Sequence, residues 1–448
     1  MNGRAIVLGF SLLTVVPALA VAVDGAPDPD FQSAGGFVAW STGTHVARRG
    51  TIAPDGAALF LSQRSGVGIY ISRVPESGPP VEANFVPSGV TSVLPGQVAF
   101  DSSGRLLVVG TATYSGLGQV IFVTRFLYPG LTLDAAFDGD GYFTFDLPEN
   151  LSGAAIAPVI VPDGIFQVER LVVGGNVFPA SGADLSDIIV LRLTHTGGLD
   201  TDFGGGDGWV RHDFDLQTNL LADLAIDSQD RIVLGGTIDP FADADGMVAR
   251  TQPNGTLDGG FGIFGWTRLE PVVDPVDELV AALTLAGDDT IWTAGVKVAT
   301  GPARQQIVLH HLDAGGTDVY SLGGFALPTR FDVAGVVHQG DGRVIVFGDT
   351  DRNDGDSDLF VTACRPEGAS PCAFELAFGP LDADHLSYPL ADLTSGGDEF
   401  AGGLALAGGR PILFADAETA TNRKAVVVRL ENAYIFVDGF ESASPAYW

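Results

Sequence analysis

Short apolar segments separated by turn residues recur along most of this chain. The segment 186–269 shows one whole unit and the start of the next: an apolar strand ends in Arg192, a glycine turn and Leu-Asp follow, and Phe203 and Trp209 lead into another strand. The same order returns through Arg250 and Phe261. No long run has apolar residues at helical spacing, so the pattern predicts many short strands joined by tight turns.

Three markers repeat in phase along the chain, which is the signature of a repeat architecture. An aromatic residue follows the first turn of each unit at Phe31, Phe85, Phe137, Phe203, Phe261, Tyr320 and Phe378. The strand that ends each unit carries Arg73, Arg125, Arg192, Arg250, His311, Ala363 or Arg429 at one position. Turn dipeptides that tolerate positive φ, as two-residue hairpins require, stand at 55–56, 103–104, 163–164, 229–230, 288–289, 341–342 and 408–409.

Each unit therefore holds about four strands in about 58 residues, and seven units fill the chain. Four antiparallel strands per unit, repeated seven times, predict an all-β, seven-bladed β-propeller. An open solenoid of stacked units is the alternative, but seven units can close a ring and no distinct capping repeat is present. Closure would bring the strand within 31–40 beside the strand within 425–430, so that no sheet edge is left open there.

The repeat resembles the delta-60 repeat family of bacterial extracellular proteins. The resemblance rests on Arg, a Gly turn, L-D-x-x-F-G and a D-G-R hairpin, as in RLTHTGGLDTDFGGGDG and HQGDGRVIVFG, and it covers nearly all of 31–430. The unit around Tyr320 departs from it because it lacks Leu-Asp. The resemblance implies a propeller-like fold and a surface location. It supplies no catalytic residues, because no reaction is established for the family.

The two ends of the chain differ from the repeats. Residues 1–22 combine Arg4, a short apolar run and small residues at Ala18 and Ala20, which predicts a secretory signal peptide cleaved after Ala20 or Ala22. An uncleaved anchor helix is the alternative, although the run is short for a membrane span. The propeller would occupy 23–433. The acidic-aromatic tail, 434–448, is either a sorting tag or a segment that packs against the ring.

The chain carries a formal net charge of −32, with 23 Lys and Arg against 55 Asp and Glu. Removal of 1–22 removes one Arg and no acid, so the mature charge is 22 − 55 = −33. Such a surface repels nucleic acid and anionic lipid and attracts cations, although it also serves simply to keep a strand-rich protein soluble. We expect a monomer without a transmembrane span in the mature chain, located outside the cell, on its surface or in the periplasm.

Two local features suggest site chemistry. The only cysteines, Cys364 and Cys372, flank a short loop, which predicts a disulfide in an oxidising compartment, with a metal clip or two free thiols as alternatives. The acidic loop 349–358 offers weak Ca²⁺ ligand candidates, and a solvated hairpin loop is the alternative. These candidates are Asp349, Asp351, Asn353, Asp354, Asp356 and Asp358. No other cofactor is indicated.

A residue pair that recurs in each unit is more typical of a structural contact than of a catalytic site, which is needed only once. Arg192 and Asp200, and Arg250 and Asp258, stand eight residues apart once per unit, which favours a structural ion pair. The aromatic residues after Gly, at Phe37, Tyr142, Trp209 and Trp266, are expected to pack between blades.

No nucleophile elbow, HExxH or phosphate loop is present, and His310, His311 and His385 are the only unusual polar candidates. The sequence therefore favours a non-catalytic binding or scaffold protein whose partner is an extracellular protein or glycan. A hydrolase or lyase that acts on extracellular polymer at the central channel is one alternative, and a purely structural surface protein is another.

Overall fold

The structure is a computed structural model. It describes residues 31, 37–41, 45–64, 68–163, 166–179, 185–239, 244–269, 277–299, 304–327, 330–340, 342–351, 357–367, 370–374, 399–418 and 423–430. The predicted signal peptide and the acidic-aromatic tail lie outside these residues.

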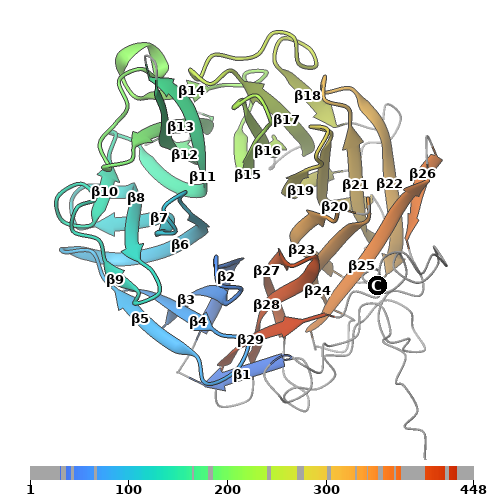
Figure 1. The fold of residues 1–448 in the computed structure, drawn as a ribbon. Coiled ribbons are helices and arrows are strands. Elements are labelled where there is room, and N and C mark those ends of the chain that lie inside the picture. The colour runs from blue at the N-terminus through green and yellow to red at the C-terminus, as the bar shows by residue number, and fades with distance from the viewer. Residues whose placement is uncertain are drawn as a thin grey trace, which may run out of the picture.

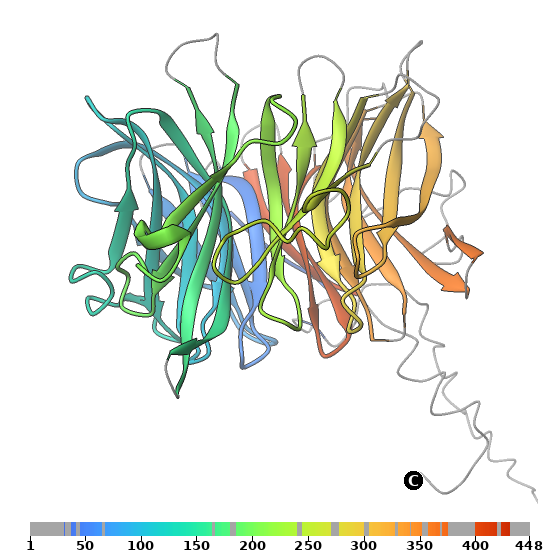
Figure 2. The same ribbon diagram turned by 90° about the horizontal axis from the view of Figure 1, so that it is seen from above.

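Seven antiparallel sheets stand around a central axis like the blades of a propeller (Figure 1). The strands run roughly along the axis between the two faces of the ring (Figure 2). The described residues hold no α-helix, so the all-β prediction and the seven-bladed prediction are both confirmed.

The first four blades follow one another along the chain, and each begins with the strand nearest the axis. Blade 1 consists of β2 (His45–Ile52), β3 (Ala58–Arg64), β4 (Ile69–Val74) and β5 (Val81–Phe85). Blade 2 consists of β6 (Val90–Phe100), β7 (Leu106–Tyr114), β8 (Gly118–Leu127) and β10 (Tyr142–Phe145), with the short β9 (Thr132–Leu133) paired to β8. Blade 3 consists of β11 (Asn150–Asp163), β12 (Phe166–Phe178), β13 (Asp187–Thr194) and β14 (Trp209–His212). Blade 4 consists of β15 (Asn219–Ile226), β16 (Ile232–Ile238), β17 (Asp245–Thr251) and β18 (Trp266–Leu269).

The last three blades keep the same plan. Blade 5 consists of β19 (Asp277–Leu285), β20 (Ile291–Ala299), β21 (Arg304–Leu312) and β22 (Asp318–Leu327). Blade 6 consists of β23 (Arg330–His338), β24 (Val344–Asp351), β25 (Ser357–Glu367) and β26 (Ser370–Phe374). Blade 7 consists of β27 (Glu399–Ala407), β28 (Arg410–Glu418), β29 (Arg423–Arg429) and β1 (Phe37–Ser41).

Strand β1 closes the ring, because it is the outermost strand of blade 7 and pairs antiparallel with β29, Phe37 lying opposite Val428. The expected meeting of the two ends of the propeller is therefore confirmed. The structure also shows that the sequence unit and the blade are offset by one strand. The strand after Gly-aromatic, such as β14, completes the sheet of the preceding Arg-bearing strand, here β13.

Every inner strand contains a β-bulge at an equivalent point, for example between Leu221 and Asp223 on β15. The residue opposite the bulge on the second strand is glycine in five blades, at Gly110, Gly175, Gly236, Gly295 and Gly348. A Cβ atom on Gly236 would lie 2.2 Å from the carbonyl oxygen of Leu220, so glycine is required by the close approach of the inner strand.

The expected two-residue hairpin forms in blade 7, where Ala407 pairs with Arg410 and both turn residues, Gly408 and Gly409, take positive φ. In blades 1, 2, 4, 5 and 6 the turn between the first and second strands is longer than expected. In blade 4 the backbone N–H of Asp230 donates to Asp227 O at 3.1 Å, and the N–H of Asp227 donates to Arg231 O at 3.0 Å. One residue, Asp230, takes positive φ, at 60°. The pattern is therefore a β-turn closed by a bulge residue, which needs positive φ at one position only.

Buried apolar side chains pack mainly between neighbouring blades rather than within one sheet. The aromatic residues after Gly contribute as expected: Tyr142 packs on Phe85, Trp209 on Phe145 and Trp266 on Phe214, with ring centroids 5.7–5.8 Å apart. Each pair joins the outer strand region of one blade to that of the next.

Candidate functional site

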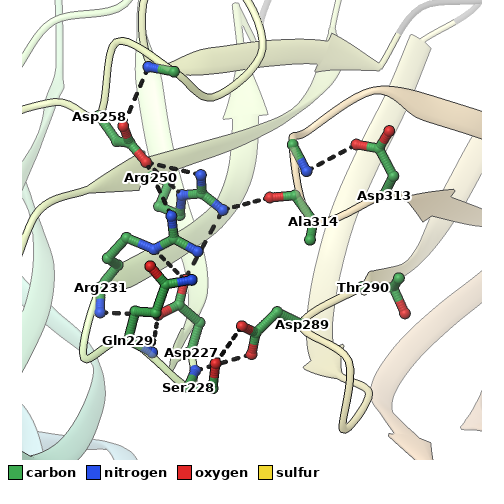
Figure 3. Close-up of polar contacts among 12 residues, drawn as sticks. Asp227, Ser228, Gln229, Arg231, Arg250, Asp258, Asp289, Thr290, Asp313 and Ala314 are labelled. Carbon is green, nitrogen blue, oxygen red and sulfur yellow. Dashed lines mark hydrogen bonds and ion pairs between the residues drawn. The ribbon is translucent and has the colours of Figure 1, made fainter.

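The Arg-Asp pair of the repeat is a buried clamp between blades. In blade 4, Arg250 Nη2 lies 2.8 Å from Asp258 Oδ2, and its guanidinium stands 4.6 Å from the centre of the Phe261 ring. Its Nη1 donates to Ala314 O of blade 5 at 2.5 Å (Figure 3). One arginine thus links its own strand, the following turn and the next blade.

The hairpin turn of the same blade supports this clamp. Asp227 accepts hydrogen bonds from Gln229 N and Arg231 N, and Arg231 Nη1 approaches Asp258 Oδ2 at 3.5 Å (Figure 3). Burial raises the pKa of Asp258, but the hydrogen bonds and charge of Arg250 outweigh it and hold the pKa below its usual value. The carboxylate is therefore kept ionised.

Equivalent clamps stand in other blades. Arg192 Nε donates to Asp200 Oδ2 at 2.7 Å, and Arg125 Nε donates to Asp134 Oδ2 at 2.7 Å. Arg429 lies 4.9 Å from the centre of the Phe31 ring, so the first aromatic anchor packs against the last blade. The predicted ion pairs are confirmed as a repeated structural feature.

Blade 5 departs from the clamp. His311 takes the place of Arg and stacks on Trp292 at a centroid distance of 4.3 Å, and burial lowers the pKa of His311. Tyr320, taken as an aromatic anchor in the sequence, lies within β22 rather than in a turn, because the third and fourth strands are joined directly by 313–317. The connection 313–317 is too short to hold the turn that carries Leu-Asp in other units, which explains why this unit lacks that dipeptide.

The ring axis carries the least repetitive polar groups. Two cavities of about 350 and 210 Å³ lie there, lined by residues of the inner strands around the bulges. The residues at or next to the bulge are mostly small, among them Gly96, Ala154, Ala222, Ala334 and Gly402. Against this background four larger polar residues of the inner strands stand out: Arg49, Gln97, Asp223 and Asp332.

Asp223 holds several blades together at the axis. Its carboxylate accepts hydrogen bonds from Gln97 Nε2 and Leu224 N, each at 3.0 Å, and from Leu283 N at 3.3 Å. Gln97 Oε1 in turn accepts a bond from Ile156 N at 2.7 Å. Burial raises the pKa of Asp223, against the opposing effects of the nearby Arg49 and of these hydrogen bonds. The contacts join blades 2, 3, 4 and 5.

Arg49 lines both cavities. Its Nη1 lies 3.8 Å from Asp223 Oδ2 and its Nη2 lies 3.5 Å from Ala222 O, so both contacts are long. Its side chain keeps 24% exposure, whereas that of Arg250 keeps 5%. The guanidinium is therefore open toward the space along the axis.

Of the candidates in the predicted Ca²⁺ loop, Asp349 and Asp351 lie on β24 and Asp358 lies on β25. The other three, Asn353, Asp354 and Asp356, lie outside the described residues. Asp349 is buried, and only the backbones of Asp351 and Asp358 are described. Within the described part of the chain no group of three His, Cys, Asp or Glu side chains is arranged to hold a metal ion. Binding of Ca²⁺ by the loop stays a prediction.

The predicted disulfide also stays a prediction, since the side chain of Cys372 lies outside the described residues. Cys364 is buried on β25, and Cys372 lies on the neighbouring strand β26. The register of the two strands places Cys364 opposite Phe374, two residues beyond Cys372.

The unusual histidines do not lie at the axis. His310 and His311 are on β21, the third strand of blade 5, and His385 lies outside the described residues. His310 is buried and contacts Glu278 and Asp318. Burial would lower the pKa of His310, but hydrogen bonds to Asp318 and Glu278 and their charges raise it to about 9.

Sequence reasoning missed the residues that do lie at the axis. The available signal was a change of residue type at the position after the bulge. In four blades the side chain there is small, at Ala155, Ala282, Gly335 and Gly403, but in two others the residue is Arg49 or Asp223. The bulge itself had to be located before this comparison could be made.

Comparisons with known proteins do not identify a family for this chain. No protein-family model matches the chain, and no curated protein matches it. Among solved structures it is similar to Drosophila Semaphorin 1a, extracellular domains 1-2, at 11% identity and a TM-score of 0.45, with 87% of each chain covered. That similarity is too distant to carry a functional argument. No helix in the described ranges is long and apolar enough to cross a membrane.

Proposed function

We propose that this protein is an exported or surface-located β-propeller that binds a ligand at the ring axis without transforming it. The observation that carries the proposal is the break in sevenfold repetition at Arg49, Gln97 and Asp223. A scaffold feature recurs in every blade, as the clamps largely do, whereas a binding site needs its polar groups once. The site is also concave, as binding sites for small molecules usually are.

Export rests on the predicted signal peptide, and membership of the delta-60 repeat family rests on the motif. The clamp gives the Arg, Leu-Asp and Phe of that motif a physical role, which supports the resemblance. We propose a monomeric protein whose partner is an extracellular protein or glycan. The N-terminal sequence of the exported protein tests the first point, with a start after Ala20 or Ala22 expected.

Ala154 and Ala135 provide a matched pair of variants for the binding site. Ala154 lines the larger cavity, and Ala135 is exposed in the loop after β9. Ala154→Phe would fill the cavity, and Ala135→Phe adds the same ring elsewhere. The wild type and Ala135→Phe should be retained on an immobilised panel of extracellular polysaccharides and their fragments, whereas Ala154→Phe should not.

Product analysis in the same experiment separates binding from catalysis. Polymer length should stay unchanged after incubation with the protein. Protein-dependent release of shorter fragments would replace this proposal with the hydrolase or lyase alternative. Failure of the wild type to bind any polysaccharide, fragment or extracellular protein presented would favour a purely structural role.

A further inference from the structure

Arg49 offers a cation whose charge is not fully used by the protein. The carboxylate of Asp223 already accepts hydrogen bonds of 3.0–3.3 Å from Gln97, Leu224 and Leu283, while Arg49 Nη1 stands 3.8 Å from it. Guanidinium groups bind carboxylates through two parallel N–H···O bonds, which neither of the long contacts of Arg49 provides. An anionic ligand group at the axis would supply this geometry.

The surroundings of Arg49 restrict the size and charge of such a ligand. The cavity of about 350 Å³ is at the small end for a ligand pocket, so it suits a single sugar-sized unit, either a free molecule or the end unit of a polymer. Asp332 lines the same cavity, and its carboxyl group disfavours a second negative charge on the ligand. A monoanion therefore fits better than a dianion such as a phosphate monoester.

The bulges supply the remaining recognition groups. A bulge residue is left out of the ladder of hydrogen bonds between strands, so its backbone polar groups can be offered to a ligand. Gly96, Ala154, Ala222, Ala334 and Gly402 occupy bulges on five inner strands, and all line the cavity. Small side chains leave these backbone groups accessible, which suits a ligand that carries several hydroxyl groups.

From these observations we infer that the channel binds a small hydroxylated monocarboxylate of the sugar-acid class, with its carboxylate on Arg49. The inference rests on the proposed binding function and adds the class of ligand. Hydroxyl groups of the ligand bind the bulge backbone and Asp332. Neutral sugars of the same size lack the group that Arg49 recognises.

The test is isothermal titration calorimetry with D-glucuronate and D-glucose, which differ in the carboxylate. Wild type should bind D-glucuronate about tenfold or more tightly than D-glucose, and added salt should weaken that binding. Arg49→Gln should lose this preference. Arg105→Gln is the matched control, because the side chain of Arg105 is 23% exposed, pairs with Asp101 and does not line either channel cavity. It should bind as wild type does.

The outcomes distinguish failure of the sugar-acid inference from failure of the proposed binding function. Equal affinity for both sugars, or unchanged D-glucuronate binding in Arg49→Gln with a wild-type melting temperature, overturns the sugar-acid inference. If neutral fragments bind and Ala154→Phe abolishes that binding while Arg49→Gln does not, the binding function stands and only the ligand class is wrong. Both proposals are overturned if wild type binds none of the ligands, or if Ala154→Phe binds them as well as wild type does.

Discussion

Replacement of Arg250 by Met should strongly destabilise the ring. The change removes the cation from Asp258 and from the Phe261 ring and frees Ala314 O of its donor. The side chains of Arg250 and Asp258 are 5% and 11% exposed, so the carboxylate would remain buried without its main partner. Breaking a buried pair in this way costs about 3–5 kcal/mol, and this range includes the lost cation–π contact.

Two further variants isolate the cause. Arg73 occupies the same repeat position in blade 1, but its partner Asp55 is 41% exposed, so Arg73→Met should cost at most about 1 kcal/mol. Arg250→Met/Asp258→Asn should regain part of the loss, because Asn removes the unpaired charge and keeps an oxygen for Gly260 N.

Urea unfolding followed by circular dichroism and by tryptophan fluorescence measures the free energies, provided that the two transitions coincide. A loss below about 1 kcal/mol for Arg250→Met would refute the clamp as a stabilising contact. An equal loss for Arg73→Met, or no recovery in the double variant, would refute burial of the unpaired carboxylate as its cause.

Three other perturbations probe the fold. Gly236→Val should lower the free energy of unfolding in urea by about 1–3 kcal/mol, because the new Cβ would meet Leu220 O. Gly287→Ala, which has open space around it, should lower that free energy much less. Equal losses would contradict the argument from close approach of the inner strand. A chain that starts at residue 45 lacks β1 and leaves β29 as an open edge, so light scattering should show association that the full chain lacks. The pKa of His310, about 9, is raised above its unfolded value of 6.5, so the stability it contributes is fully present below about pH 6.5 and is lost as pH rises through about 9. The melting temperature of wild type should fall over that window relative to His310→Gln, and parallel curves would show that His310 is not the titrating group.

The architecture could be predicted from the sequence because the unit repeats, whereas the axial site could not be predicted. Arg192 and Asp200 are eight residues apart, and the recurrence of this spacing in several units makes their contact predictable from the sequence. Arg49 and Ala222 touch across 173 positions of sequence, and nothing periodic links them. A contact that recurs in each unit leaves a periodic pattern in the sequence. A single contact between distant strands leaves none, because it depends on the β-bulges that turn both residues toward the axis.

The offset between sequence unit and blade also constrains how the ring can form. Blades 1 to 6 can each complete their sheets from consecutive chain, but blade 7 needs β1 and β29, the first and the last of the described strands. Contacts of such long sequence separation form late, because the loop that they close is entropically costly. Until blade 7 forms, the backbone groups of β1 stay unpaired, so the incomplete ring carries an open strand edge with which a second chain could pair.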